Sequence, residues 1–175
     1  MVIRLLLKCV VALVCITAII TVSANDKLVD DHFTIPVELK TTDFHLVKVD
    51  PNYSALDYKA LMSARHFIRQ QLGSEWPGDN FSLLENTESL KSDLEQFEQK
   101  KNFTYHIFNQ NKSQIIGCVY ISANPSENID ASVFIWMSAD YLNKPFFEKV
   151  RLTTKQWIDN HWPFNKVDYS LNDAR

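Results

Sequence analysis

The chain has 175 residues, with 18 Lys and Arg against 21 Asp and Glu, and a formal net charge of −3. This length predicts one domain with a sizeable core. There is no basic block, and the aromatic residues do not alternate with Lys or Arg, so the sequence predicts no nucleic-acid partner.

The first 24 residues have the pattern of a secretory signal peptide. Arg4 and Lys8 form a positive start, Cys9–Ile20 is an apolar run without a charge, and Val22–Ala24 offers small residues for cleavage. The run of 12 residues is shorter than the roughly 20 that a spanning helix needs. We therefore expect Asn25 to be the first mature residue. The alternative is an uncleaved anchor, which would be the only contact with a membrane. Both interpretations place the domain outside the cytoplasm, in the periplasm or secreted.

Cleavage at this position leaves Cys118 as the only thiol, so no internal disulfide is possible. Cys118 lies between Gly117 and Val119 in an apolar stretch, which predicts a buried structural thiol. The five histidines (His32, His45, His66, His106 and His161) show no metal-ligand spacing, so the sequence predicts no metal.

In the first half of the chain, residues 25–42 are expected to be a polar leader, and the domain is expected to span residues 43–171, with a tail at 172–175. Asp43–Val49 alternates as a half-buried strand. Ser54–Leu72 carries apolar residues at helical spacing and stops before Gly73. After a loop, Ser82 with Glu85 predicts a capping box at the start of a second helix that ends near residue 101.

In the second half, three strands are predicted at Phe103–Asn109, Gln114–Ser122 and Ala131–Met137, separated by two polar turns. A helix over Lys144–His161 and a closing strand over Lys166–Leu171 follow. The order β-α-α-β-β-β-α-β predicts an α/β (α+β) domain with a mixed, mostly antiparallel sheet, in which Ala131–Met137 is the fourth strand.

This order, together with particular residues, resembles the GNAT superfamily of acyl-CoA N-acyltransferases, and within it a poorly characterised GNAT-like group. The resemblance covers about residues 43–169. The matching residues are Asp57–Ser63, Trp76–Pro77, Phe97–Glu98, Phe103–Tyr105, Gly117–Ile121, Asp130–Ala131, Trp136, Trp157, Trp162–Phe164 and Tyr169.

The resemblance implies transfer of an acetyl or other acyl group from acyl-CoA to an unknown small-molecule or protein amine. In such enzymes the fourth strand splays from its neighbour, the pantetheine arm lies in the gap, and the pyrophosphate sits on amides at the start of the next helix. The implied acyl-CoA residues are Trp136, Met137, Ser138, Ala139, Asp140, Tyr141 and Lys144. The candidates for acid and base are Asp130, Tyr120 and Tyr169.

The sequence departs from the family at the pyrophosphate loop. The usual pattern is Arg/Gln-x-x-Gly-x-Gly/Ala, whereas here no glycine follows Gly117, Ser138 stands where the similar group tends to have arginine, and Asp140 adds a negative charge. Acyl-CoA is also a cytoplasmic metabolite. Three hypotheses follow: an exported acyltransferase, a catalytically inactive GNAT-fold module that binds a partner or ligand through its cleft, and a cytoplasmic enzyme that starts near Met62. A start near Met62 would delete the first strand and part of the first helix. The lost glycines favour the second hypothesis, whereas the resemblance as a whole favours the acyltransferase.

Overall fold

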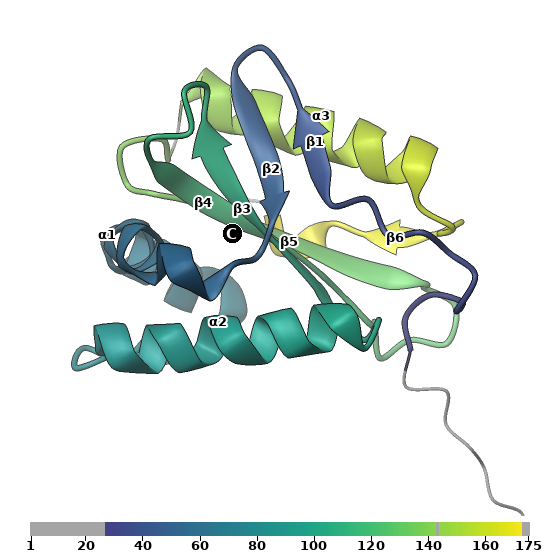
Figure 1. The fold of residues 1–175 in the computed structure, drawn as a ribbon, viewed down its shortest axis with the longest axis horizontal. Helices are drawn as coiled ribbons and strands as arrows, with labels where there is room; N and C mark the ends of the chain where they lie inside the picture. The colour runs from purple at the N-terminus through teal and green to yellow at the C-terminus, as the bar shows by residue number, and fades with distance from the viewer. Residues whose placement is uncertain (1–26, 143, 173–175) are drawn as a thin grey trace, which may run out of the picture.

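The computed structural model describes residues 27–142 and 144–172. The predicted signal peptide and its cleavage site lie outside the described residues. Six strands form one sheet in the order β1-β2-β3-β4-β5-β6, with α1 and α2 on one face and α3 on the other (Figure 1). The predicted α/β class with a mostly antiparallel sheet is therefore confirmed. Within the described part of the chain, no helix is long and apolar enough to cross a membrane.

The elements follow the chain in the predicted order, with one additional strand at the start. Their bounds are β1 Glu38–Lys40, β2 Phe44–Lys48, η1 Pro51–Tyr53, α1 Ser54–Leu72, α2 Leu83–Glu98, β3 Phe103–Asn109, β4 Ile115–Ser122, β5 Ala131–Met137, α3 Pro145–His161, β6 Val167–Asp168 and η2 Ser170–Asn172.

Local sequence signals set the helix ends. Gly73 caps α1 in the left-handed region, with φ 61°, which glycine adopts without a side-chain clash. The predicted capping box is present at α2, because Glu85 N–H donates to the Ser82 hydroxyl (3.2 Å) and Ser82 N–H donates to the Glu85 carboxylate (2.7 Å). α3 begins at Pro145 and has no side-chain cap from Lys144.

The register of the central strands decides which side chains share a face. In the antiparallel β3–β4 pair, His106 lies opposite Cys118. Gly117 lies opposite Met137, and a Cβ at Gly117 would clash with the backbone carbonyl oxygen of Trp136. The position therefore requires glycine because the strands approach closely, and not because of its φ.

The closing strand is shorter than predicted. β6 pairs with β5 in parallel at two positions only, Ala131 with Val167 and Ser132 with Asp168, after which the chain turns into η2. The expected strand over residues 166–171 is wrong in length because the Asp168 side chain accepts the N–H of Ser170 (2.8 Å), which bends the chain.

The buried side chains form two clusters, one on each face of the sheet. The cluster on the α3 face contains Ile107, Val119, Ile121, Val133, Ile135, Met137, Val150, Trp157 and Ile158, among others. The cluster on the α1 and α2 face contains Ala60, Leu61, Ala64, Ile68, Phe108, Ile115, Cys118, Phe134 and Trp136.

The segment expected as a polar leader is part of the fold from its first described residues. Val29 is buried, β1 extends the sheet, and Leu28 N–H donates to the carbonyl oxygen of Lys100 (2.7 Å). The Lys100 ammonium donates to three carbonyl oxygens, those of Asp30 (3.2 Å), Asp31 (2.7 Å) and Phe33 (2.9 Å). The apolar residues in this segment recur at neither helical nor strand spacing, and for that reason the sequence pattern did not predict that they pack on the domain.

Candidate functional site

The loop after β5, which the sequence predicts to hold pyrophosphate, borders a cavity of about 270 Å³. Ser138, Asp140 and Tyr141 line it from the loop, and the facing wall comes from α1 and the start of β4. The α1 and β4 wall consists of Leu56, Lys59, Ala60, Ser63, Ser113, Gln114, Ile115 and Ile116.

Most backbone donors of this loop already have acceptors within the protein. Ser138 N–H donates to Ile116 O (2.8 Å), Ala139 N–H to the Ser63 hydroxyl (3.1 Å), and Tyr141 N–H to Ser138 O (2.9 Å). An anion bound here would have to compete with these bonds. The first turn of α3 also carries Glu148, whose negative charge would repel an anion bound at the start of this helix.

The remaining predicted acyl-CoA residues lie in three different environments. Trp136 and Met137 are fully buried, on opposite faces of the sheet. Lys144 is exposed at the start of α3. The structure thus brings Ser138, Asp140 and Tyr141 to one cavity and places Trp136 and Met137 in the two core clusters.

The three predicted catalytic residues do not come together. Asp130 is exposed, and its carboxylate accepts the backbone N–H groups of Asn165 (2.6 Å) and Lys166 (2.9 Å), which hold its pKa below the usual value. Tyr169 packs on the α3 face, where burial raises its pKa and its ring lies 4.8 Å from the Lys155 ammonium. Asp130 therefore joins the ends of β5 and β6, and Tyr169 packs on the opposite face of the sheet from Tyr120.

Tyr120 lies between two cavities on the α1 and α2 face of the sheet. The cavities measure about 250 and 300 Å³, and both are lined by Trp76, Asp93 and Tyr120. The smaller one also contacts Asp57 and Asn86, whereas the larger one reaches Phe134 of β5.

Asp93 is the carboxyl group at the centre of this cleft. Its pKa is raised to about 6, first by burial and then by the nearby Asp57, while the hydroxyl of Thr104 and the ring of His106 act in the opposite direction. A carboxyl group with this pKa changes protonation near neutral pH, which suits general acid–base chemistry. Burial raises the pKa of Tyr120 far above its usual value, so its hydroxyl stays protonated and can donate a hydrogen bond.

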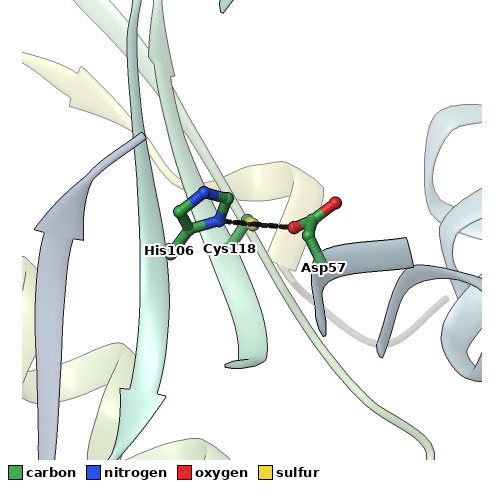
Figure 2. A group of neighbouring side chains, drawn as sticks. All are labelled: Asp57, His106 and Cys118. Atoms are coloured by element: carbon green, nitrogen blue, oxygen red, sulfur yellow. Dashed lines mark hydrogen bonds and ion pairs between the residues drawn. The ribbon is translucent and has the colours of Figure 1, made fainter. Parts of the chain in front are cut away.

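Beside this cleft, Asp57, His106 and Cys118 point towards one another from α1, β3 and β4 (Figure 2). The Cys118 thiol donates to Asp57 Oδ1 (3.1 Å), and His106 Nδ1 lies 3.3 Å from the same oxygen and 3.6 Å from the sulfur. Asn86 Nδ2 donates to the second oxygen of Asp57 (2.9 Å). All four residues are buried, and burial raises the pKa of the Cys118 thiol. The expected burial of Cys118 is confirmed.

Sequence reasoning missed Asp93 as a site residue, although a signal was present. Asn86, Leu90, Asp93 and Phe97 follow one another at helical spacing, and three of them are buried. Two polar residues therefore interrupt the apolar stripe of α2, which indicates a polar cluster or a site rather than plain packing.

Comparison with protein-family models and with curated proteins finds no match. The fold, in contrast, is similar to solved acetyltransferases. The ribosomal-protein-S5-alanine acetyltransferase from Vibrio fischeri matches with a TM-score of 0.54 and 16% identity, over 70% of this chain and 67% of that chain. RimL, a ribosomal L7/L12 alpha-N-protein acetyltransferase solved in complex with coenzyme A, matches with a TM-score of 0.52 and 17% identity, over 70% and 66%. A GNAT-family acetyltransferase from Bacillus anthracis matches with a TM-score of 0.50 and 13% identity, over 70% and 67%.

These matches define the class of fold. The chain has the GNAT acetyltransferase fold, as the sequence predicted, and it spans about two thirds of the length of these enzymes.

Proposed function

We propose that this chain is a GNAT-fold acyltransferase that moves an acetyl or other acyl group from acyl-CoA to an amine. The fold supports acyl transfer as a class of reaction, and one of the similar enzymes was solved with coenzyme A. The observation that carries the proposal is the placement of Asp93, with a pKa of about 6, beside Tyr120 in the cleft on the α1 and α2 face.

The two residues have complementary roles in this reaction. The ionised Asp93 accepts a proton from the attacking amine as the new C–N bond forms. The C–S bond then breaks, the departing thiolate accepts a hydrogen bond from the Tyr120 hydroxyl, and it takes its proton through solvent from the protonated Asp93. This assignment replaces Asp130 and Tyr169 as candidates and keeps Tyr120.

Both parts of the site adjoin β5. The larger cavity is lined by Phe134 of this strand, whose ring stacks on that of Tyr120 with centroids 6.4 Å apart, and the 138–141 loop follows the same strand. We assign the phosphates of acyl-CoA to the cavity of Ser138, Asp140 and Tyr141, where Lys59 supplies positive charge from α1.

A second candidate function is a GNAT-fold binding module without catalysis. The internal hydrogen bonds of Ser138, Ala139 and Tyr141 and the negative charge of Asp140 favour it, since they oppose anion binding at the family's usual place.

We also propose that the domain acts outside the cytoplasm, in the periplasm or secreted, on a small-molecule or protein amine. The charged start and apolar run of the first 24 residues support this. N-terminal sequencing of the protein after expression of the full chain tests it, because an intact Met1 in a soluble cytoplasmic fraction would contradict export.

Calorimetry with acetyl-CoA and with free CoA at low salt separates the two functions. If the phosphates bind at the loop, Asp140→Asn should tighten binding about two- to fivefold by removing repulsion near the helix start. The matched control is Asp159→Asn, which also removes an exposed negative charge, near the other end of α3, and should leave affinity unchanged.

Turnover on a panel of amines then tests the assignment of the base. Asp93→Asn should reduce kcat by at least about a hundredfold with little change in acetyl-CoA affinity, whereas Asp130→Asn should retain turnover. If neither the wild-type protein nor Asp140→Asn binds acetyl-CoA, the acyltransferase proposal is wrong and the binding module is the better account.

A further inference from the structure

We propose that Asp57, His106 and Cys118 form a binding site for a divalent transition-metal ion of the zinc type. This proposal is independent of acyl transfer. Three different ligand atoms, an oxygen, an imidazole nitrogen and a sulfur, face one another from α1, β3 and β4 (Figure 2). Their side chains are between 0 and 3% exposed. Thiolate and imidazole ligands together favour zinc over magnesium or calcium.

The distances between the ligand atoms fit a tetrahedral ion. Zinc binds sulfur at about 2.3 Å, nitrogen at about 2.0–2.1 Å and oxygen at about 2.0–2.2 Å, so the edges of a tetrahedral site are about 3.3 Å for N···O and about 3.5 Å for S···N and S···O. In the structure, His106 Nδ1 to Asp57 Oδ1 is 3.3 Å, Cys118 Sγ to His106 Nδ1 is 3.6 Å, and Cys118 Sγ to Asp57 Oδ1 is 3.1 Å. Two edges agree, and the third needs to open by only a few tenths of an ångström.

The groups behind the ligands hold them in the orientation that metal binding needs. A ligating histidine usually donates its other ring N–H to a carbonyl or carboxylate. Here His106 Nε2 lies 3.4 Å from the carbonyl oxygen of Asp50 and 3.3 Å from the backbone nitrogen of the same residue. Metal binding at Nδ1 requires the tautomer that carries its proton on Nε2, which then donates to the Asp50 carbonyl oxygen and leaves Nδ1 directed at Asp57. Asn86 holds the outer oxygen of Asp57 at 2.9 Å, so the inner oxygen faces the histidine and the cysteine.

Charge also favours an ion at this position. A buried carboxylate is costly unless it is paired, and the polar contacts of Asp57 described above are with a histidine, a thiol and an amide. Binding would replace the S–H bond of Cys118 with a sulfur–metal bond and release that proton. The doubly charged ion would then balance the Asp57 carboxylate and the Cys118 thiolate.

A fourth ligand would come from the side of Asp57. Of the three ligands, Asp57 lines the cavity of about 250 Å³, together with Asp93 and Tyr120. A water molecule from this cavity would complete three protein ligands to four, the arrangement that open zinc sites use.

Cobalt(II) is the probe that tests the site in the wild-type protein. The protein, purified without a histidine tag after expression of the full chain and dialysed against EDTA, is titrated with Co²⁺ and then with Zn²⁺. We expect one Co²⁺ per chain, visible bands of a tetrahedral ion, a thiolate-to-cobalt charge-transfer band, and loss of all three signals when one equivalent of Zn²⁺ is added.

Two variants locate the binding. Cys118→Ser should abolish the charge-transfer band and weaken Zn²⁺ binding by about tenfold or more. His66→Gln, which changes an exposed histidine on α1, should bind as the wild-type protein does. A wild-type spectrum without the charge-transfer band, or equal Zn²⁺ affinity in Cys118→Ser, would show that the three residues form a hydrogen-bonded network only. If Cys118→Ser fails to fold, the wild-type spectrum alone decides.

Discussion

Replacing Asp93 with asparagine should stabilise the protein at neutral and alkaline pH. The groups that face Asp93 come from α1, β3 and β4: Asp57, Thr104, His106, Cys118 and Tyr120. Burial and the charge of Asp57 raise its pKa from 3.8 to about 6, whereas the Thr104 hydroxyl and the His106 ring act to lower it. Asparagine has the same shape, keeps an acceptor for the Thr104 hydroxyl and carries no charge.

The size and the sign of this change in stability follow from the raised pKa of Asp93. Between pH 3.8 and about 6 the folded state binds more protons at Asp93 than the unfolded state does, so the contribution of this group to stability falls as the pH rises through that window. A rise of about two units corresponds to a loss of about 3 kcal/mol above pH 6. Asp93→Asn removes this loss. The free energy of unfolding of this variant should therefore exceed that of the wild-type protein by up to about 3 kcal/mol at pH about 8, and by almost nothing at pH about 4.

Urea unfolding of both proteins at matched pH values measures this difference, with EDTA present so that no metal binds near Asp57. Comparison at each pH cancels the other carboxyl groups, such as Asp130, whose lowered pKa acts in the opposite direction in both proteins. Asp159→Asn, which removes an exposed carboxylate, should show no pH-dependent gain. If Asp93→Asn is no more stable than wild type at alkaline pH, Asp93 is not held at a raised pKa, and its assignment as the base fails.

Three further changes test the structure. Gly117→Ala should destabilise the fold by about 3 kcal/mol because its methyl group meets the backbone of β5, whereas Gly78→Ala, which has open space around it, should be neutral within about 0.5 kcal/mol in urea unfolding. Asp130→Asn should lower stability at neutral pH and lose that effect as the pH falls through the lowered pKa of the carboxyl group; equal melting curves at pH about 7 would contradict its role between β5 and β6. Lys112 and Lys100 both have positive φ (56° and 61°), but of the two only Lys100 donates to three carbonyl oxygens. The melting temperature should therefore rise in Lys112→Gly, which relieves the strained backbone, and fall in Lys100→Gly, which loses these hydrogen bonds.

The sequence predicted most of the fold because its strongest signals are local. The bounds of β3 and β5 agree with the predicted strands, since each is an apolar, β-branched run between polar turns. The capping box located the start of α2 for the same reason. β1 was missed because three residues, Glu38–Lys40, are too few to show alternation.

The candidate site was less predictable because its residues meet only through tertiary structure. His106 and Cys118 share a face because of the β3–β4 register, and Asp57, which is 61 residues from Cys118 in the sequence, reaches them from α1. A search for metal-ligand spacing within one helix or strand cannot find three residues that come from three different elements. Asp130 was chosen for its place at the head of a strand, but which donors its carboxylate meets depends on where β6 begins.

The contacts of Lys100 fix where the start of the domain lies. They pin residues 28–33 to the connection between α2 and β3, at the end of the sheet where Phe103 lies opposite Ile121. The 138–141 loop follows Met137, which pairs with Gly117 towards the other end of the same strands. If the N-terminal segment is an uncleaved membrane anchor, it would join the domain at the end of the sheet opposite the 138–141 loop. The loop would then face away from the membrane.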